Sequence, residues 1–362
     1  MTDVPFFWID NSDDFVAALE RHRGDDVALD TEFSMGVRYG CRLCVVQLGW
    51  RDEIVLVDAQ EVDVAPLAGL FADGVHVVTH AGHNDYEVLD DALGRRPQSG
   101  FDTQVAARFL GYPEPGLHAL TTEMLGVELD KSQQRVDWTR RPLSEKTLHY
   151  AASDVAHLFD LRDAVVDRLH ERGRLEWALE DCAAYLDWFD DDVAPTELWW
   201  HLKNRKLIPK NRRLAAQRMA ITREEWAERF NRPPSHIMTD VALVDLVSAS
   251  TPTADSVRAV VHRRWATNEF VRGVLHALRP GEDSEELNLP PRVDSSREFR
   301  EALDAAVDHV RATADAHEIL PAVLGSRRDI LDFLAGRPSR LDSGWRVPLV
   351  GDYLSKARAS LP

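Results

Sequence analysis

The sequence predicts an α/β domain with a mixed sheet, followed by all-α helical domains. Up to about residue 172, short apolar runs of strand length alternate with segments of helical apolar spacing, which is typical of an α/β domain. From about residue 196 onward the spacing is helical and shows no strand pattern. A length of 362 residues is sufficient for two or three domains, each with its own core.

Acidic segments that contain proline divide the chain. One of them includes Pro195, and the other spans residues 279–292, so we interpret both as linkers. The expected organisation is an α/β domain over residues 1–172, a linker over 173–195, a helical domain over 196–278, a linker over 279–292 and a second helical domain over 293–362.

Four apolar runs predict strands in the first domain. They are VALDTEF (27–33), RLCVVQLGW (42–50), EIVLVDA (53–59) and VHVVTHA (75–81). A turn from Trp50 to Glu53 would join two of these strands as a hairpin, which predicts a sheet of mixed strand directions. The helical segments include LHALTTEMLG (117–126) and HYAASDVAHLFDL (149–161).

Five polar residues are spaced so that they can converge on one site. Asp30 and Glu32 are two residues apart in a predicted strand, so both carboxylates point to the same face. Tyr150 and Asp154 are four residues apart in a predicted helix and also share a face. Asp85 lies near the expected start of another helix, beyond a strand. Side chains of these types can hold two divalent metals and a nucleophilic water.

Each of these features alone also has an ordinary structural explanation. An Asp-x-Glu pair at a strand end is usually a solvated edge or turn, and a Tyr and an Asp on one helix are usually a surface pair. Asp85 in a first helical turn would interact favourably with the helix dipole. The combination, in this order along the chain, favours a metal-dependent nuclease.

The surrounding sequence resembles the ribonuclease D family. That family belongs to the DEDD group of 3′-to-5′ exonucleases, in the variant whose last motif carries a tyrosine. The resemblance covers the first 170 residues or so densely and the remainder more loosely. Five ordered blocks carry it: LDTEF (29–33), HAGHNDYEVL (80–89), FDTQVAARFLGY (101–112), LDKSQQRVDWTRRPL (129–143) and YAASDVAHL (150–158).

The resemblance implies a ribonuclease-H-like α/β fold and a role for each matching residue. Asp30, Glu32, Asp85 and Asp154 occupy the four metal-binding acidic positions. Tyr150 occupies the position that orients the attacking water. Two divalent cations about 4 Å apart can activate water and stabilise the leaving oxygen of a phosphodiester. Carboxylates suit Mg²⁺ or Mn²⁺, so we expect two such ions as cofactors.

Other residues of these blocks are candidates for substrate contacts. Phe33 resembles the family's aromatic or apolar residue beside the terminal base, and an ordinary core position explains it equally well. Lys131, Arg135 and Trp138 could contact phosphate and base, or they could brace their loop against the helix that carries Tyr150.

Three further polar residues are better explained by structure than by ligation. Asp102 precedes a helix and is interpreted as its cap. His80 and His83 could bind a transition metal, and we interpret them as structural histidines instead.

The composition is that of an ordinary globular protein, with 44% hydrophobic and 29% charged residues. No apolar stretch approaches the roughly 18 residues of a membrane span, and the N-terminus shows no secretory pattern. Cys41 and Cys44 form a CxxC, but Cys182 cannot complete a zinc site or a disulfide framework with them. We therefore expect buried thiols, no membrane partner and a cytoplasmic location.

The net charge of -18 is unusual for a protein that binds nucleic acid. Lys and Arg are nevertheless concentrated between His201 and Arg232, where ten of them stand against three Glu residues. A solvated helical face would account for some of this charge, whereas a nucleic-acid patch accounts for its clustering. The predicted patch begins with Lys203, Arg205, Lys206, Lys210, Arg212 and Arg213.

The helical part resembles the HRDC domain, a module named for helicases and ribonuclease D. RPPSHIMTDVALVDL (232–246) is the most telling segment, and residues 324–354 resemble the divergent second HRDC-like domain of ribonuclease D. Such modules would help to grip or thread RNA.

The resemblance implies a 3′-to-5′ exoribonuclease that releases nucleoside 5′-monophosphates and needs no obligate protein partner. Its substrates would be tRNA precursors or other structured RNA with 3′ extensions. One alternative is a DNA exonuclease with a repair role, since HRDC modules also accompany DNA helicases. The other is a non-catalytic nucleic-acid-binding protein on an exonuclease scaffold, although such proteins usually lose a metal ligand and this chain has all four.

Overall fold

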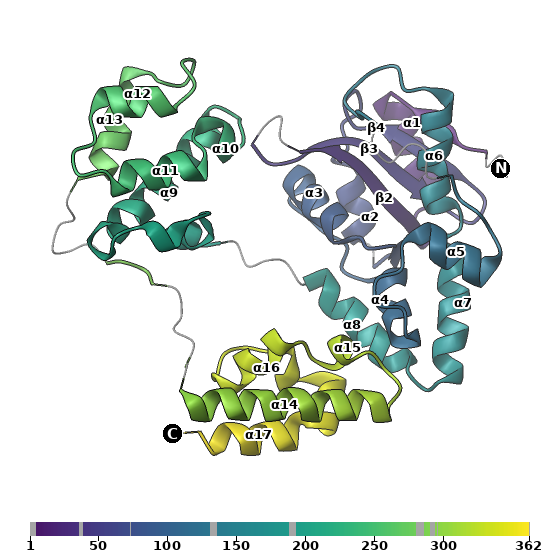
Figure 1. The fold of residues 1–362 in the computed structure, drawn as a ribbon. Helices are drawn as coiled ribbons and strands as arrows, with labels where there is room; N and C mark the ends of the chain where they lie inside the picture. Colours follow the sequence, from purple (N-terminus) through teal and green to yellow (C-terminus); the bar gives the residue numbers. More distant parts are fainter. Residues whose placement is uncertain are drawn as a thin grey trace. The chain divides into compact units, whose positions relative to one another are not determined.

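The chain folds into two compact units (Figure 1). The first contains residues 1–33, 43–189 and 293–362, and the second contains residues 34–42 and 190–292. The structure, a computed structural model, describes residues 5–35, 39–72, 74–130, 136–187, 193–279, 286–289, 294 and 296–361.

A six-stranded mixed sheet forms the centre of the first unit, in the order β1-β4-β3-β2-β5-β6. β3 and β4 are antiparallel, whereas the pairs β1–β4, β2–β5 and β5–β6 are parallel. Between β3 and β4, Trp50 N donates to Glu53 O at 2.7 Å, so the predicted hairpin and mixed sheet are confirmed. The strands are β1 (Phe7–Ile9), β2 (Val27–Ser34), β3 (Arg42–Gly49), β4 (Ile54–Asp58), β5 (Val77–Thr79) and β6 (Gly100–Asp102).

Helix α6 packs along one face of the sheet (Figure 1). This is the face to which Ala28 and the other even-numbered residues of β2 point. Ala28 of β2 shares a buried apolar cluster with Ala151 and Val155 of α6. Gly49 permits this close packing, since a Cβ there would lie 3.3 Å from Val155. The other helices that accompany the sheet are α1 (Ser12–Arg21), α2 (Leu67–Ala72), α3 (His83–Leu93), α4 (Thr103–Ala107), α5 (Leu117–Leu125), α7 (Leu158–Glu171) and α8 (Leu175–Asp187), and α6 itself spans Glu145–Ala156.

Asp102 organises the connection between β5 and α3. Its buried carboxylate accepts hydrogen bonds from Ala81 N at 3.1 Å and Gly82 N at 2.8 Å. It also caps α4 by accepting from Gln104 N and Val105 N, as predicted. The start of α3, which carries Asp85, is therefore held by a fixed turn.

The predicted linker at residues 173–195 differs from the structure. Most of it forms α8, because Ala178, Cys182 and Leu186 recur at helical spacing and are buried. The acidic composition of the sequence after this helix predicts a linker, but the apolar stripe formed by Ala178, Cys182 and Leu186 determines the local structure. The second predicted linker, residues 279–292, lies largely outside the described residues.

The C-terminal helices share a buried core with α4, α7 and α8. Leu161 of α7 and Cys182 of α8 belong to the same cluster as Phe299, Val310 and Trp345. These helices are therefore part of the first unit. They are α14 (Arg297–Ala316), α15 (Pro321–Leu324), α16 (Arg327–Leu334) and α17 (Asp352–Ala359).

From residue 193 onward, every regular element among the described residues of the second unit is helical, as predicted. Its core surrounds Met219 and Trp226 of α9 and Phe270 of α13. Across the described ranges of both units, no helix combines the length and apolar character needed to cross a membrane. The helices of the second unit are α9 (Arg213–Arg229), α10 (Pro234–Ile237), α11 (Asp240–Ser248), α12 (Ala254–Val260) and α13 (Asn268–Ala277), preceded by 3₁₀ turns that include Pro195–His201.

Candidate functional site

Three of the predicted carboxylates converge where β2 faces α6. Asp30, Glu32 and Asp154 each offer an oxygen, and these oxygens all lie within 4.8 Å of one another. The two-residue period of β2 points Asp30 and Glu32 toward the helix. Packing of Ala151 and Val155 against the sheet then places Asp154 beside them.

Tyr150 lies one helical turn before Asp154 on α6. The phenol and the carboxylate lie close enough to interact, since the pKa of Tyr150 is raised by burial and then by the charge of Asp154. The ring of Tyr150 is also 6.4 Å from that of buried Trp138. The phenol is thus directed at the carboxylate cluster rather than at solvent.

Asp85 reaches the site from α3 and is held by the strand that carries the acidic pair. Its Oδ1 accepts a hydrogen bond from Thr31 N at 3.0 Å and a short one from the Thr31 hydroxyl. Asp85 is not in the group of three oxygens that lie within 4.8 Å of one another. It stands beside this group, close enough for its charge to raise the pKa of Asp30.

Thr31 and Gln47 are neighbours of the site that the sequence analysis did not identify. Gln47 of β3 is fully buried, and its Nε2 lies 3.4 Å from Asp30 Oδ2. A polar residue inside the otherwise apolar run RLCVVQLGW was the signal that could have identified Gln47. The signal for Thr31 was its place between two acidic residues on one strand.

Burial, together with repulsion between neighbouring carboxylates, raises the pKa values of the four acidic residues. Burial, followed by the charges of Asp154 and Asp85, raises the pKa of Glu32 to about 8. Burial is also the main cause that raises the pKa of Asp154 to about 7 and that of Asp85 to about 6. The pKa of Asp30 is raised by burial and then by its three acidic neighbours. Negative charge here is therefore unfavourable unless a cation balances it.

The donor set suits a hard divalent cation. All the side chains that converge offer oxygen, which Mg²⁺ and Mn²⁺ prefer. Asp30, Glu32 and Asp154 could hold an ion directly, with Asp85 beside them. Such an arrangement can polarise a phosphate oxygen and lower the pKa of a bound water.

Only two of the four residues predicted to contact substrate belong to the described residues, and these two have different surroundings. Phe33 follows Glu32 in β2 and is partly exposed, and strand alternation directs it to the face opposite the acidic pair. Trp138 is buried and packs near Tyr150. Lys131 and Arg135 lie outside the described residues. A role of these four residues in substrate binding stays a prediction.

The loop that carries Trp138 is fastened to the sheet. Arg141 donates to both carboxylate oxygens of Asp58, at the end of β4, with both distances 2.5 Å. The same guanidinium donates to the carbonyl oxygens of Trp138 and Cys44. These bonds tie the loop to the sheet, whereas the brace considered for this block, against the helix that carries Tyr150, corresponds to the packing of Trp138 beside Tyr150.

His80 and His83 have structural surroundings. Nδ1 of His80 is 2.9 Å from Thr103 Oγ1, and Nε2 is 2.9 Å from Pro115 O. Burial lowers the pKa of His80. The ring of His83 packs against Tyr185. Both ring nitrogens of His80 are thus used within the fold, as expected for a structural histidine.

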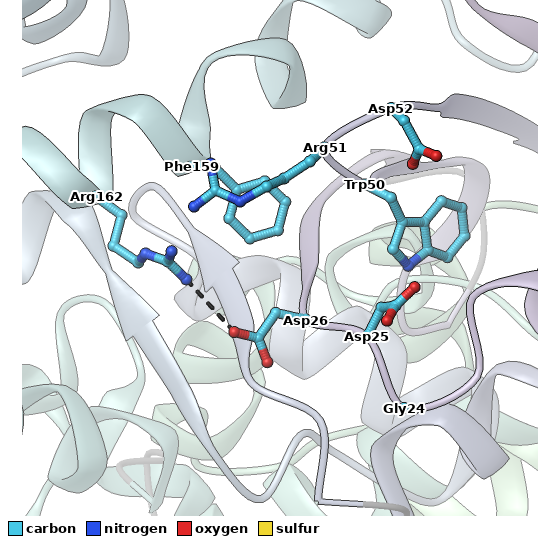
Figure 2. A pocket seen from close by; sticks show the side chains of 8 residues that line it. All are labelled: Gly24, Asp25, Asp26, Trp50, Arg51, Asp52, Phe159 and Arg162. Atoms are coloured by element: carbon cyan, nitrogen blue, oxygen red, sulfur yellow. Dashed lines mark ion pairs between the residues drawn. The ribbon is translucent and has the colours of Figure 1, made fainter.

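A separate hollow of about 460 Å³ opens beside the turn between β3 and β4 (Figure 2). Arg51 and Arg162 lie over the ring of Phe159, one wall of this hollow. Both guanidinium groups also bond Asp163. Their charge is therefore balanced within the fold, and none of the five predicted site residues lines this hollow.

The predicted basic patch contains side chains of two kinds. Lys203, Arg205, Lys206 and Lys210 are exposed. Arg212 instead donates from Nε to Val247 O at 2.7 Å and from Nη1 to Leu278 O at 3.2 Å, which ties α9 to the ends of α11 and α13. Arg213 is only partly exposed.

Comparison with known proteins gives a consistent result. The family model described as 3′-5′ exonuclease matches residues 6–170. Ribonuclease D of Gluconacetobacter diazotrophicus and that of Granulibacter bethesdensis are each 33% identical to this chain, over 95% of its length and 90% of theirs. The solved structure of Escherichia coli RNase D, an exoribonuclease involved in structured RNA processing, has a TM-score of 0.88 and 26% identity, covering 99% of this chain and 100% of that one. The chain therefore belongs to the ribonuclease D family and is a hydrolytic 3′-to-5′ exoribonuclease.

Proposed function

We propose that Asp30, Glu32, Asp85 and Asp154 hold two divalent cations, Mg²⁺ or Mn²⁺, and that Tyr150 orients the attacking water. The observation that supports this most strongly is the approach of three carboxylates from β2 and α6 to within 4.8 Å. Like charges at this separation repel one another, and a cation removes the repulsion. When bound, the ions would supply an activated water and stabilise the oxygen that leaves phosphorus.

Tyr150 would act as a hydrogen-bond donor rather than as a base. Burial, followed by the charge of Asp154, raises the pKa of this phenol above its ordinary value. The hydroxyl therefore keeps its proton at neutral pH and can hold a water in line with the phosphate. Because Tyr150 and Asp154 are on the same helix, the position of the phenol is fixed relative to the carboxylates.

The proposed substrates are tRNA precursors or other structured RNA with 3′ extensions, which lose one nucleotide at a time as the 5′-monophosphate. The E. coli relative, described as acting in structured RNA processing, supports this substrate class. Exposed Lys203, Arg205, Lys206 and Lys210 would contact phosphates. All five site residues come from one chain, so no partner is needed to complete the site. The proposed location is the cytoplasm, since three cysteines are too few for a disulfide framework.

Digestion of a 5′-labelled, 3′-extended tRNA would test the proposal, with a matched DNA strand alongside. We expect a ladder of shortened RNA with Mg²⁺ or Mn²⁺, none with chelator, and none with Asp30→Ala. A ladder on DNA alone would overturn the proposed substrate. Full activity of Asp30→Ala would overturn the assignment of the site.

A further inference from the structure

We propose that Thr31 is a positioning residue for Asp85, and that its hydroxyl sets how this carboxylate faces the acidic pair on β2. The inference deepens the proposed function and rests on it, because it concerns a side chain that bonds one of the proposed metal ligands. Thr31 itself offers no ligand to the site, since its hydroxyl is used to hold Asp85.

Both hydrogen bonds from Thr31 end on one oxygen of Asp85. The backbone N and the hydroxyl of Thr31 donate to Asp85 Oδ1. Two donors hold this oxygen more firmly than the backbone N alone would, so the hydroxyl restricts how the carboxylate can turn.

The geometry of β2 explains why Thr31 can hold Asp85. Thr31 lies between Asp30 and Glu32 on β2, so its side chain leaves the opposite face of the strand. The acidic pair faces α6, and the threonine hydroxyl meets α3. A single strand thus sets the positions of three of the four proposed ligands, two directly and one through Thr31.

The two hydrogen bonds from Thr31 to Asp85 matter for the position of this carboxylate because both residues are buried. Thr31 is 5% exposed and Asp85 is 6% exposed, so water cannot readily replace a missing donor. Hydrogen bonds to a charged acceptor are stronger than neutral ones. The turn before α3 is held independently by Asp102, so removal of the Thr31 hydroxyl should rotate the carboxylate without displacing the helix.

Three substitutions separate this role from a packing role. Thr31→Val keeps the branched shape and the backbone N but removes the hydroxyl. Thr31→Ser keeps the hydroxyl and removes a methyl group. Thr121→Val is the matched control, because Thr121 is a buried threonine whose hydroxyl donates to His118 O within α5 rather than to a carboxylate.

The variants would be compared in the full chain by three measurements. These are kcat and KM on 3′-extended RNA, Mn²⁺ binding by calorimetry without RNA, and thermal unfolding with chelator. We expect Thr31→Val to lose about 10- to 100-fold in kcat or in Mn²⁺ affinity, with a smaller change in KM, because residues that orient metal ligands have effects of this size. Thr31→Ser should recover most of the loss, and Thr121→Val should behave as wild type.

Two outcomes would overturn the inference. Thr31→Val could bind Mn²⁺ and turn over RNA as wild type does, or Thr31→Ser could be as impaired as Thr31→Val, which would indicate packing. Should Thr31→Val fail to fold, Thr31→Ala beside Thr31→Ser gives the same comparison. If Asp85→Ala cleaves RNA as fast as wild type, the proposed role of Asp85 fails and the inference fails with it, a result distinct from failure of Thr31 alone.

Discussion

Arg346 donates a hydrogen bond to each carboxylate oxygen of Asp181, both at 2.7 Å. The indole N–H of Trp345 also donates to Asp181, at 2.9 Å. Asp181 lies on α8, and the two donors lie between α16 and α17. Because Arg346 is 4% exposed, this bidentate pair is a buried connection between the C-terminal helices and the remainder of the first unit.

We predict that Asp181→Ala lowers the free energy of unfolding by about 3–5 kcal/mol, because the variant leaves a buried guanidinium without its partner. Urea unfolding would measure this decrease. Glu301→Ala is the control, since the pair Arg297–Glu301 on α14 is exposed. Removal of that pair should cost about 1 kcal/mol or less. Equal decreases in the two variants would contradict a special role of the buried connection.

A second prediction concerns the phenol of Tyr150. Tyr150→Phe should lower kcat by about 10²- to 10⁴-fold, the range for removal of a group that assists proton transfer or orients water. Mn²⁺ affinity should stay close to that of wild type, because the carboxylates are unchanged. Calorimetry and single-turnover digestion would separate these effects. A large decrease in Mn²⁺ affinity would show instead that the phenol acts mainly by positioning the neighbouring Asp154.

Much of the site follows from local periodicity. The two-residue period of a strand puts Asp30 and Glu32 on one face, and the helical period puts Tyr150 and Asp154 on another, so sequence spacing predicts both pairs. The structure brings these pairs together because α6 packs on the face of β2 that carries Ala28.

Contacts between segments that are far apart in the sequence cannot be predicted from local periodicity. The bond between Thr31 and Asp85 joins residues 54 positions apart. It depends on the position at which α3 begins, directly after the turn that Asp102 holds. Gln47 lies beside Asp30 only because β3 is adjacent to β2 in the sheet. The sequence-based prediction of a linker over residues 173–195 is wrong for α8, because the spacing of Ala178, Cys182 and Leu186, and not the acidic composition beyond it, determines the local structure.

A third prediction follows from the protonation of Glu32. Its pKa is raised to about 8 in the folded, metal-free protein, whereas a glutamate in an unfolded chain has a pKa near 4.3. The raised pKa contributes stability below about pH 4, and this stability is lost as the pH rises to about 8. Glu32→Gln cannot ionise, so its melting temperature with chelator should rise relative to wild type between pH 5 and pH 8.

Glu298→Gln is the control for this prediction, since Glu298 is exposed on α14. It removes one exposed negative charge, so it shows how much of the change in melting temperature comes from the loss of a charge alone. Saturating Mn²⁺ should reverse the difference between Glu32→Gln and wild type at pH 8, so that wild type has the higher melting temperature. At that pH the ionised carboxylates of wild type bind the cation and stabilise the fold. A constant difference between Glu32→Gln and wild type from pH 5 to pH 8 would contradict the raised pKa.

The last prediction separates the exposed basic side chains of the patch from Arg212, which holds the fold together. Substitution of both Arg205 and Lys206 by alanine should weaken RNA binding and leave the melting temperature unchanged, because both side chains are exposed. For each phosphate of single-stranded RNA that the double variant no longer neutralises, the slope of log affinity against log salt should fall by about 0.7. Arg212→Ala should lower the melting temperature, because Arg212 holds the carbonyl groups of Val247 and Leu278. Filter binding over a salt series and thermal unfolding would distinguish these effects, and an unchanged salt slope in the double variant would exclude this patch from the RNA interface.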